Sequence, residues 1–166
     1  MTATTDRDDT DTTNPAHTAR QRWMHTLASA PGASVDDAWR RWTPKPAVQR
    51  IRGPETGLVM LRARIDSVGD RFNLGEATVT RATVRLHGAP LAADSVGTAY
   101  ILGTDHEHAY AAACFDALLC DSAVRRRVLA EVIDPMRRAI DDLDAARRAE
   151  ARSTLVDFFN VTREHE

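Results

Sequence analysis

The chain has 166 residues, of which 43% are hydrophobic and 28% charged, and its formal net charge at pH 7 is −2. The length indicates one globular domain, and the near-neutral charge excludes the basic surface of a typical nucleic-acid-binding protein. No apolar run is long enough to span a membrane and no signal-peptide pattern opens the chain, so we expect a cytoplasmic protein. Cys114 and Cys120 are the only cysteines, which favours a reducing compartment over a disulfide framework.

The first part of the chain is predicted to be a tail followed by helices. Residues 1–15 are rich in Thr and Asp and lack an aliphatic pattern, so we expect a disordered acidic tail before a single α+β domain over residues 16–166. The spacing of Trp23 and Leu27 predicts a helix that ends before Pro31.

A second short helix follows, and after it the hydrophobic period changes from helical to alternating. Ser34 and Asp37 have the spacing of a capping box for this helix. About four strands then form an antiparallel meander, at residues 48–52, 58–65, 72–86 and 95–102.

The turns and faces of these strands follow from the same pattern. Residues 53–57 (Gly-Pro-Glu-Thr-Gly) are predicted to be a turn, and the strand at 72–86 is long enough to be bent or bulged near Gly75. In the second strand, one face carries alternating apolar residues, as in a half-buried strand, and the other carries Met60 and arginines. The apolar face consists of Val59, Leu61, Ala63 and Ile65.

After Gly103 the spacing of the hydrophobic residues is helical up to about Ala146. Thr104 and Glu107 have capping-box spacing, Asp121 with Ser122 is predicted to cap a second helix, and Asp134 with Pro135 a third. Strands followed by helices argue for an α+β fold, in which N-terminal and C-terminal helices flank the sheet.

Three carboxylates near glycines are candidates for chemistry. A pair among Glu55, Glu76 and Asp105 could serve as general acid and base or hold Mg²⁺. Carboxylates at turns more often accept hydrogen bonds from backbone amides, which is the simpler interpretation. The residues alone indicate no catalytic group.

Arginines on the predicted strands are a second candidate. Arg62, Arg64, Arg81 and Arg85 could share one sheet face and form a floor that binds anions. The alternative is a solvated face or a surface that is ion-paired with a partner. His106 and His108 are two residues apart on a helix, so their rings point to different sides and no metal site is predicted there.

Aromatic residues leave two interpretations open. Trp23, Trp39 and Trp42 are expected to be core or interface anchors, because no basic surround suggests nucleic-acid stacking. Phe158 and Phe159, with Leu155, either pack back on the domain or form a docking patch for a second chain.

Several segments in collinear order resemble the PhnG family, a subunit of the bacterial carbon–phosphorus lyase core complex. The resemblance covers about residues 16–163. It rests on Arg22-Trp23-Met24, Glu55-Thr56-Gly57-Leu58-Val59, Phe72, Gly75-Glu76, Thr80-Arg81, Val84-Arg85-Leu86, Gly103, Asp105, His108-Ala109, Asp116-Ala117-Leu118 and Val156-Asp157-Phe158-Phe159.

The resemblance implies a non-catalytic but required subunit, with PhnI-, PhnH- and PhnJ-like partners and an assisting PhnL. The implied reaction replaces the adenine of MgATP by an alkylphosphonate. An iron–sulfur subunit that uses S-adenosylmethionine cleaves the C–P bond later. No cofactor is expected in this chain, which lacks both a cysteine triplet and a Walker A loop.

Two other functions remain open at this point. In one, Glu76 and Asp105 hold Mg²⁺–triphosphate and Arg81 and Arg85 bind the phosphates, so that the chain has its own nucleotide and phosphonate site. In the other, the chain is a stand-alone phosphonate-responsive binding protein that acts without partners or turnover.

Overall fold

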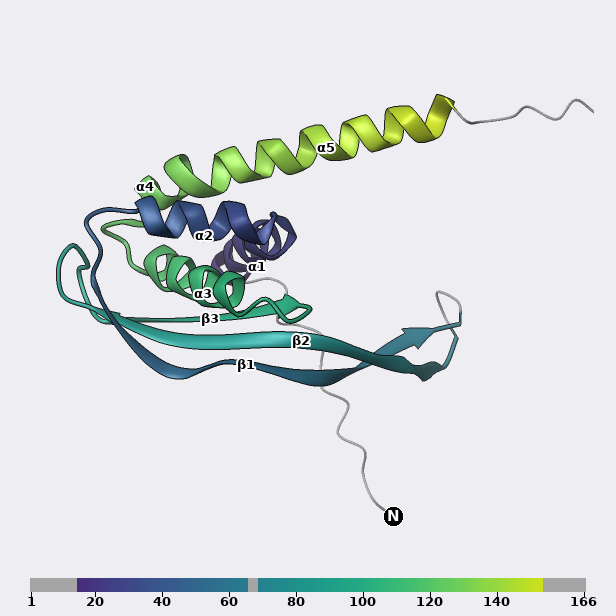
Figure 1. Cartoon of the computed structure of the whole chain (residues 1–166), viewed down its shortest axis with the longest axis horizontal. Coiled ribbons are helices and arrows are strands. Elements are labelled where there is room, and N and C mark those ends of the chain that lie inside the picture. Colours follow the sequence, from purple (N-terminus) through teal and green to yellow (C-terminus); the bar gives the residue numbers. More distant parts are fainter. Residues whose placement is uncertain (1–14, 66–68, 154–166) are drawn as a thin grey trace, which may run out of the picture.

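The computed structural model describes residues 15–65 and 69–153 and shows an α+β fold, as predicted (Figure 1). The expected N-terminal tail and the apolar segment at residues 155–159 lie outside the described residues. The elements are α1 (Pro15–Ser29), α2 (Gly32–Arg41), β1 (Ala47–Arg64), β2 (Arg71–His87), β3 (Ser95–Leu102), α3 (His106–Cys120), α4 (Arg125–Val128), the π-helical turn η2 (Leu129–Ile133) and α5 (Asp134–Ser153).

The described sheet has three antiparallel strands in the order β1-β2-β3, not about four. The predicted turn at residues 53–57 is wrong, because the chain continues through it as one strand. Gly53 has a φ of +67°, and register shifts between Arg50 and Glu55 show that the extra residues form bulges against β2. A glycine in the left-handed region allows such a bulge without reversing the chain.

Alternation along β2 separates a covered face of the sheet from an open one. Thr80, Ala82, Val84 and Leu86 are buried beneath the helices, whereas Arg81 and its neighbours at alternate positions face the other way. We call these the helix-side face and the outer face. The bulge predicted near Gly75 is confirmed, because Leu61 pairs with Gly75 and Arg62 with Asn73.

Helix α3 is the centre of the core. Eleven of its fifteen residues are buried, and many of them are alanines, so the helix can approach the sheet closely. A Cβ atom at Gly97, on β3, would overlap the carbonyl oxygen of Ala113 and the backbone nitrogen of Ala117. Gly97 therefore allows direct contact between the backbones of β3 and α3.

The other side of α3 is covered by α1 and α2. Trp39 and Trp42 pack edge-on against the Phe115 ring, with centroid distances of 5.6 and 6.2 Å. Trp23 is also buried, so the prediction that the tryptophans are core anchors is confirmed.

Two predicted helix caps are wrong, one by three residues and one by a single residue. α2 begins at Gly32 after Pro31, which makes no side-chain cap, so Ser34 lies inside the first turn. α3 is capped by Asp105, whose Oδ1 accepts a hydrogen bond of 2.9 Å from the His108 backbone nitrogen. The residue that caps α3 is thus Asp105 and not the predicted Thr104. Asp121 does accept from the Ala123 nitrogen, ahead of α4.

The helix from α4 to α5 is continuous, so Asp134 is not an N-cap. Its φ and ψ of −65° and −39° are helical. Pro135 lacks an N–H and would disturb a regular helix at this point. The preceding π-helical turn widens the helix there and accommodates the proline.

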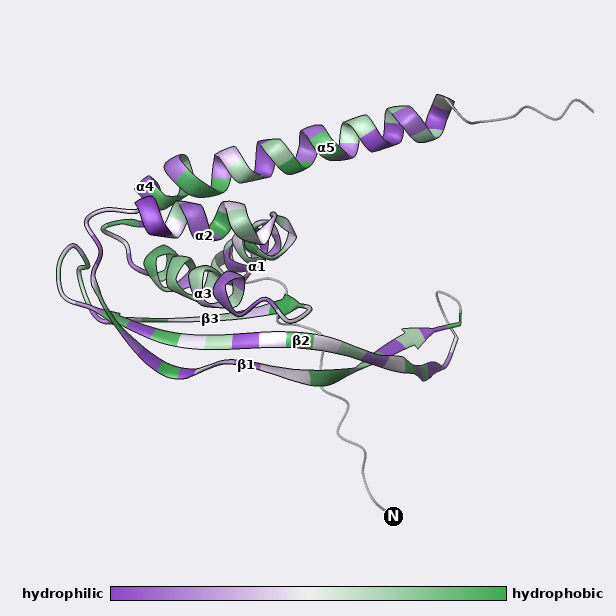
Figure 2. Cartoon of the chain, in the orientation of Figure 1, coloured by the Kyte–Doolittle hydropathy of each residue, from purple (hydrophilic) through white to green (hydrophobic). Residues whose placement is uncertain are grey.

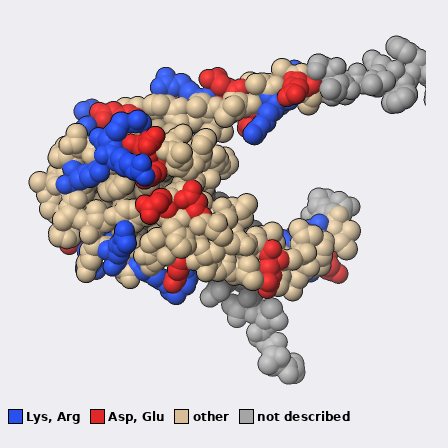
Figure 3. Space-filling model, in the orientation of Figure 1, with Lys and Arg blue, Asp and Glu red and all other residues tan. Residues whose placement is uncertain are grey.

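Two elements project from the helical body on the same side (Figure 1). One is α5, and the other is the part of β1 and β2 that extends beyond the helices. We call residues 57–64 and 71–79 of these strands the ribbon. Hydrophobic residues are visible along the ribbon in Figure 2, and an open notch separates it from α5 in the space-filling view (Figure 3).

Two further properties of the described residues concern hydropathy and cysteines. None of their helices is both long and hydrophobic enough for a membrane span. Cys114 is buried and Cys120 exposed, and neither forms a disulfide.

Candidate functional site

An ion-paired carboxylate lies on the outer face of the sheet where the ribbon begins. One oxygen of Glu55, Oε1, accepts hydrogen bonds from the Nε atoms of Arg52 and Arg81, each at 2.6 Å. Glu55 and Arg81 are paired across β1 and β2, so the sheet register brings them together. We call Arg52, Glu55 and Arg81 the Glu55 cluster.

The Glu55 cluster borders a shallow hollow of about 300 Å³. Backbone and side chains of β1 and β2 form its floor, and Tyr100 of β3 closes one side. The lining residues are Glu55, Thr56, Gly57, Leu58, Val59, Val79, Arg81 and Tyr100. The hollow thus lies between the charged Glu55 cluster and the apolar outer face of the ribbon.

The two arginines favour the ionised form of the Glu55 carboxyl. Hydrogen bonds from Arg52 and then Arg81 lower the pKa of its carboxyl. A carboxylate with a lowered pKa is a poor general base near neutral pH. An exposed ion pair of this kind adds little to stability, because solvent screens the two charges. The clearest role of Glu55 is therefore to orient two guanidinium groups.

On the helix-side face, a chain of hydrogen bonds links β1, β2 and α3. The Thr80 hydroxyl donates to the Gly103 carbonyl oxygen at 2.8 Å. Thr80 Oγ1 and Thr56 Oγ1 are 2.9 Å apart, and Thr56 Oγ1 and His106 Nε2 are also 2.9 Å apart. Because each hydroxyl has one proton, Thr56 donates to Thr80 and His106 Nε2 donates to Thr56.

The two histidines of α3 have different partners, as their spacing predicted. His106 contacts Thr56 on the sheet, and His108 Nε2 lies 2.7 Å from the Leu27 carbonyl oxygen in the core. Asp105 is engaged as the helix cap. Among the described residues, no group of three or more His, Cys, Asp or Glu side chains is placed to hold a metal ion.

The four candidate binding residues do not share one site. Arg81 and Arg85 lie on the outer face of β2, and Glu76 lies on the helix-side face, where it pairs with Met60. Asp105 lies at the start of α3.

The arginine floor, one of the two interpretations that the sequence left open, is not formed. Thr56 of β1 pairs with Thr80, which is buried on the helix-side face. Successive residues of β1 alternate between the two faces, so residues 58, 60, 62 and 64 lie on the same face as Thr56. Arg62 and Arg64 therefore lie on the opposite face from Arg81 and Arg85.

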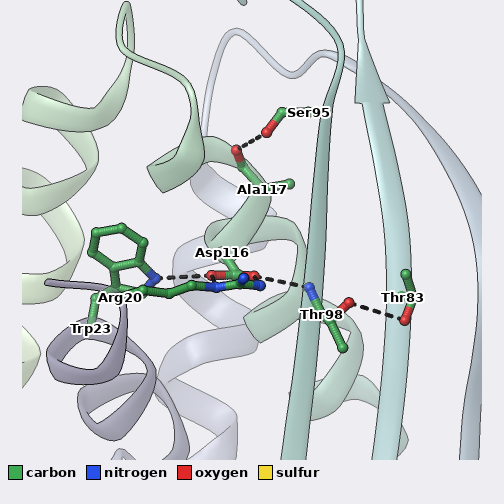
Figure 4. A network of polar contacts seen from close by, with 7 residues as sticks. All are labelled: Arg20, Trp23, Thr83, Ser95, Thr98, Asp116 and Ala117. Carbon is green, nitrogen blue, oxygen red and sulfur yellow. Dashed lines mark hydrogen bonds and ion pairs between the residues drawn. The ribbon is translucent and has the colours of Figure 1, made fainter. Parts of the chain in front are cut away.

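A buried carboxylate in the middle of α3 joins three elements (Figure 4). Asp116 Oδ1 accepts from Arg20 Nε and Trp23 Nε1, at 3.1 and 2.9 Å. Its Oδ2 accepts from Arg20 and from the Thr98 backbone nitrogen, at 2.6 and 2.9 Å. All four bonds come from within the chain, so this network is structural.

Two larger hollows lie beside α1. One, of about 500 Å³, is bounded by α1, η2 and α5, and the other, of about 550 Å³, lies between α1 and the edge of β3. Both are lined mainly by apolar surface. Such a lining suits contact with another polypeptide better than a charged nucleotide.

Sequence reasoning missed the hydrogen-bond chain and the Asp116 network. The signal for Asp116 was a lone carboxylate within an apolar helical segment, which requires a buried partner. Thr56, Thr80 and Gly103 belong to three segments far apart in sequence on which the family resemblance rests. The structure brings these segments together at one place.

A family model and a curated relative both match this chain. The family model described as "Phosphonate metabolism protein PhnG" matches residues 18–164. Over 144 residues the chain is 43% identical to the alpha-D-ribose 1-methylphosphonate 5-triphosphate synthase subunit PhnG of Rhizobium meliloti (strain 1021). That alignment covers 87% of this chain and 88% of the relative.

Proposed function

The chain belongs to the PhnG family of phosphonate metabolism proteins, and we propose that it is a required, non-catalytic subunit of the carbon–phosphorus lyase core complex. The observation that carries this proposal is the near full-length match to a relative named as a synthase subunit. Related chains that align over most of their length at 43% identity have the same fold and are expected to occupy the same place in an assembly.

The reaction that the subunit supports is transfer of an alkylphosphonate to the ribose of MgATP. The bond between ribose C1 and adenine breaks, a bond from C1 to a phosphonate oxygen forms, and adenine leaves with a proton. The product is a ribose 1-phosphonate 5-triphosphate. This step needs a proton donor for adenine and a cationic site for the triphosphate.

The described side chains support placing these groups on partner subunits. Glu55 is held ionised by two arginines, Asp105 caps α3, and Asp116 is fully used in the core. Because Arg81 and Glu76 lie on opposite faces of the sheet, these candidates do not fit a single Mg²⁺–triphosphate site.

The partners in this proposal are PhnI-, PhnH- and PhnJ-like subunits, assisted by PhnL, in the cytoplasm. The exposed apolar residues of the ribbon support the proposal that this chain binds other subunits.

The test is to co-express the chain, carrying an affinity tag, with these subunits from the same organism. The expected result is that they purify together, and that adenine release from MgATP and methylphosphonate is lost when this chain is omitted. Full activity of the remaining subunits without it would contradict the proposal.

A further inference from the structure

The ribbon has the sequence pattern of a buried strand but is not covered by the described part of the chain. Apolar residues alternate at positions 59, 61 and 63 of β1, the spacing typical of a strand with one face in a core. Val59 is nevertheless 40% exposed, Leu61 44% and, on β2, Phe72 40%. The cover for this face therefore has to come from elsewhere.

These residues form one continuous surface on the outer face. Phe72 pairs with Ala63, beside Leu61, and Ala77 pairs with Val59. On the side of β3 the surface continues into Leu102, which is 76% exposed and pairs with Val79. We call Val59, Leu61, Ala63, Phe72, Val79 and Leu102 the apolar strip. It begins at the hollow beside the Glu55 cluster.

The helix-side face of the ribbon tip is basic. Arg62, Arg64 and Arg71 lie there, and Arg64 and Arg71 are directly opposed. None of the three forms an ion pair with a residue that the structure describes. Directly opposed like charges destabilise a strand pair unless an anion lies between or beside them.

We propose that the ribbon is the docking arm of this chain and that its occupant is another subunit of the same synthase. This inference rests on the proposed function. The partner surface presents apolar side chains to the apolar strip and carboxylates to Arg62, Arg64 and Arg71. Binding on both faces of the ribbon removes the exposed apolar surface and neutralises the opposed arginines together.

Charge argues for a different chain over a second copy of this one. Within residues 57–64 and 71–79 there are three arginines and one carboxylate, Glu76. Two copies of the ribbon would therefore bring like charges together. Its location is also suited to contact, because β1 is an edge strand of the sheet, to which another polypeptide can add.

The experiment compares variants in the co-expressed complex. Val59→Asp with Leu61→Asp disrupts the apolar strip, and Arg62→Glu with Arg64→Glu reverses the tip charge. Leu143→Asp is the matched control, because Leu143 is a similarly exposed apolar residue, at 52%, but lies on α5. Circular dichroism of each free chain verifies that it is folded.

Both ribbon variants are expected to bind the partner about tenfold more weakly or worse, whereas Leu143→Asp binds like the wild type. In the wild-type complex, backbone amides of the ribbon are expected to exchange hydrogen more slowly than in the free chain.

Three outcomes would overturn the inference. A wild-type complex that tolerates the ribbon variants, with unchanged ribbon exchange, contradicts the docking arm but leaves the proposed function standing. Ribbon-dependent dimers of the free chain would make a second copy the occupant. A wild-type chain that binds no co-expressed subunit contradicts the proposed function as well.

Discussion

The carboxylate of Asp116, on α3, accepts a hydrogen bond of 2.9 Å from the backbone N–H of Thr98, on β3. β3 is one edge of the sheet, and this N–H would otherwise be available to another strand. A helix side chain therefore closes this edge at Thr98. The opposite edge is β1, the strand that carries half of the ribbon, and it is suited to a partner strand.

Replacing Asp116 by Asn is expected to lower the free energy of unfolding by about 3 kcal/mol. The amide nitrogen would replace one of the two oxygens and would face Arg20 and either Trp23 or Thr98, all of which are donors. Those donors would be left without an acceptor. Urea unfolding followed by tryptophan fluorescence measures the change.

The matched control is Asp144→Asn. Asp144 pairs only loosely with Arg147 and Arg148 on the exposed surface of α5, at 3.7 and 4.0 Å. Its loss is expected to change stability by less than about 0.5 kcal/mol. Equal effects of the two substitutions would show that Asp116 does not hold the core together.

Gly97→Ala is expected to lower the free energy of unfolding by about 2 kcal/mol or more, because its methyl group would overlap the α3 backbone. Gly57→Ala serves as the control, since a methyl group at that position would meet no other atom within 4 Å. That variant should be within about 0.5 kcal/mol of the wild type. Similar unfolding curves for both variants would contradict the close packing of β3 on α3.

The sequence predicted the helices, the alternation of apolar and polar residues along the strands, and the class of fold, because all three depend on local patterns. It failed at residues 53–57, where Gly53 and Pro54 indicate a turn by local rules. Whether such a pair reverses the chain or only bulges depends on the partner strand, and the pairing of Glu55 with Arg81 is a long-range contact.

The candidate site was only partly predictable for the same reason. Glu55 and Asp105 were identified as carboxylates near turns and Arg81 as an arginine on a strand. Which face of the sheet Glu55 and Arg81 would occupy depended on the register between β1 and β2. The apolar alternation at Val59 and Leu61 was detected and correctly placed on one face. What the sequence could not show is that this face stays exposed within the described chain.

Cys114 is expected to make the stability of the protein fall above pH 9. Burial raises the pKa of its thiol to about 12, whereas in the unfolded chain the thiol ionises near its ordinary value of 9.0. Below pH 9 the thiol is neutral in both states and has no effect. Between pH 9 and about 12 only the unfolded state loses the proton, so unfolding becomes more favourable.

The measurement is urea unfolding at several pH values from about 8 to about 11, for the wild type and for Cys114→Ala. The wild type should lose up to about 1.4 kcal/mol more per pH unit than the variant. The variant removes the thiol together with its interaction with Tyr110, whose pKa is raised by burial and then by Cys114, so the difference between the two profiles reports the thiol and this interaction. Parallel pH profiles would refute this account of the thiol.

Arg81→Gln is expected to reduce adenine release by the complex about tenfold, with little change in stability because the ion pair of Arg81 with Glu55 is exposed. Its guanidinium lies at the start of the apolar strip, where the partner is proposed to bind, and is half-exposed there. Arg147→Gln, on α5, is the control and should keep full activity. Unfolding curves separate a loss of contact from a loss of fold, and equal activity of both variants would exclude a role for Arg81.

The most direct test of the central claim is adenine release from MgATP and methylphosphonate by the purified chain alone and after the other subunits are added. Our account predicts no release by the chain alone, and release once the complex is assembled. Turnover by the isolated polypeptide would contradict the claim that the groups that make and break bonds belong to its partners.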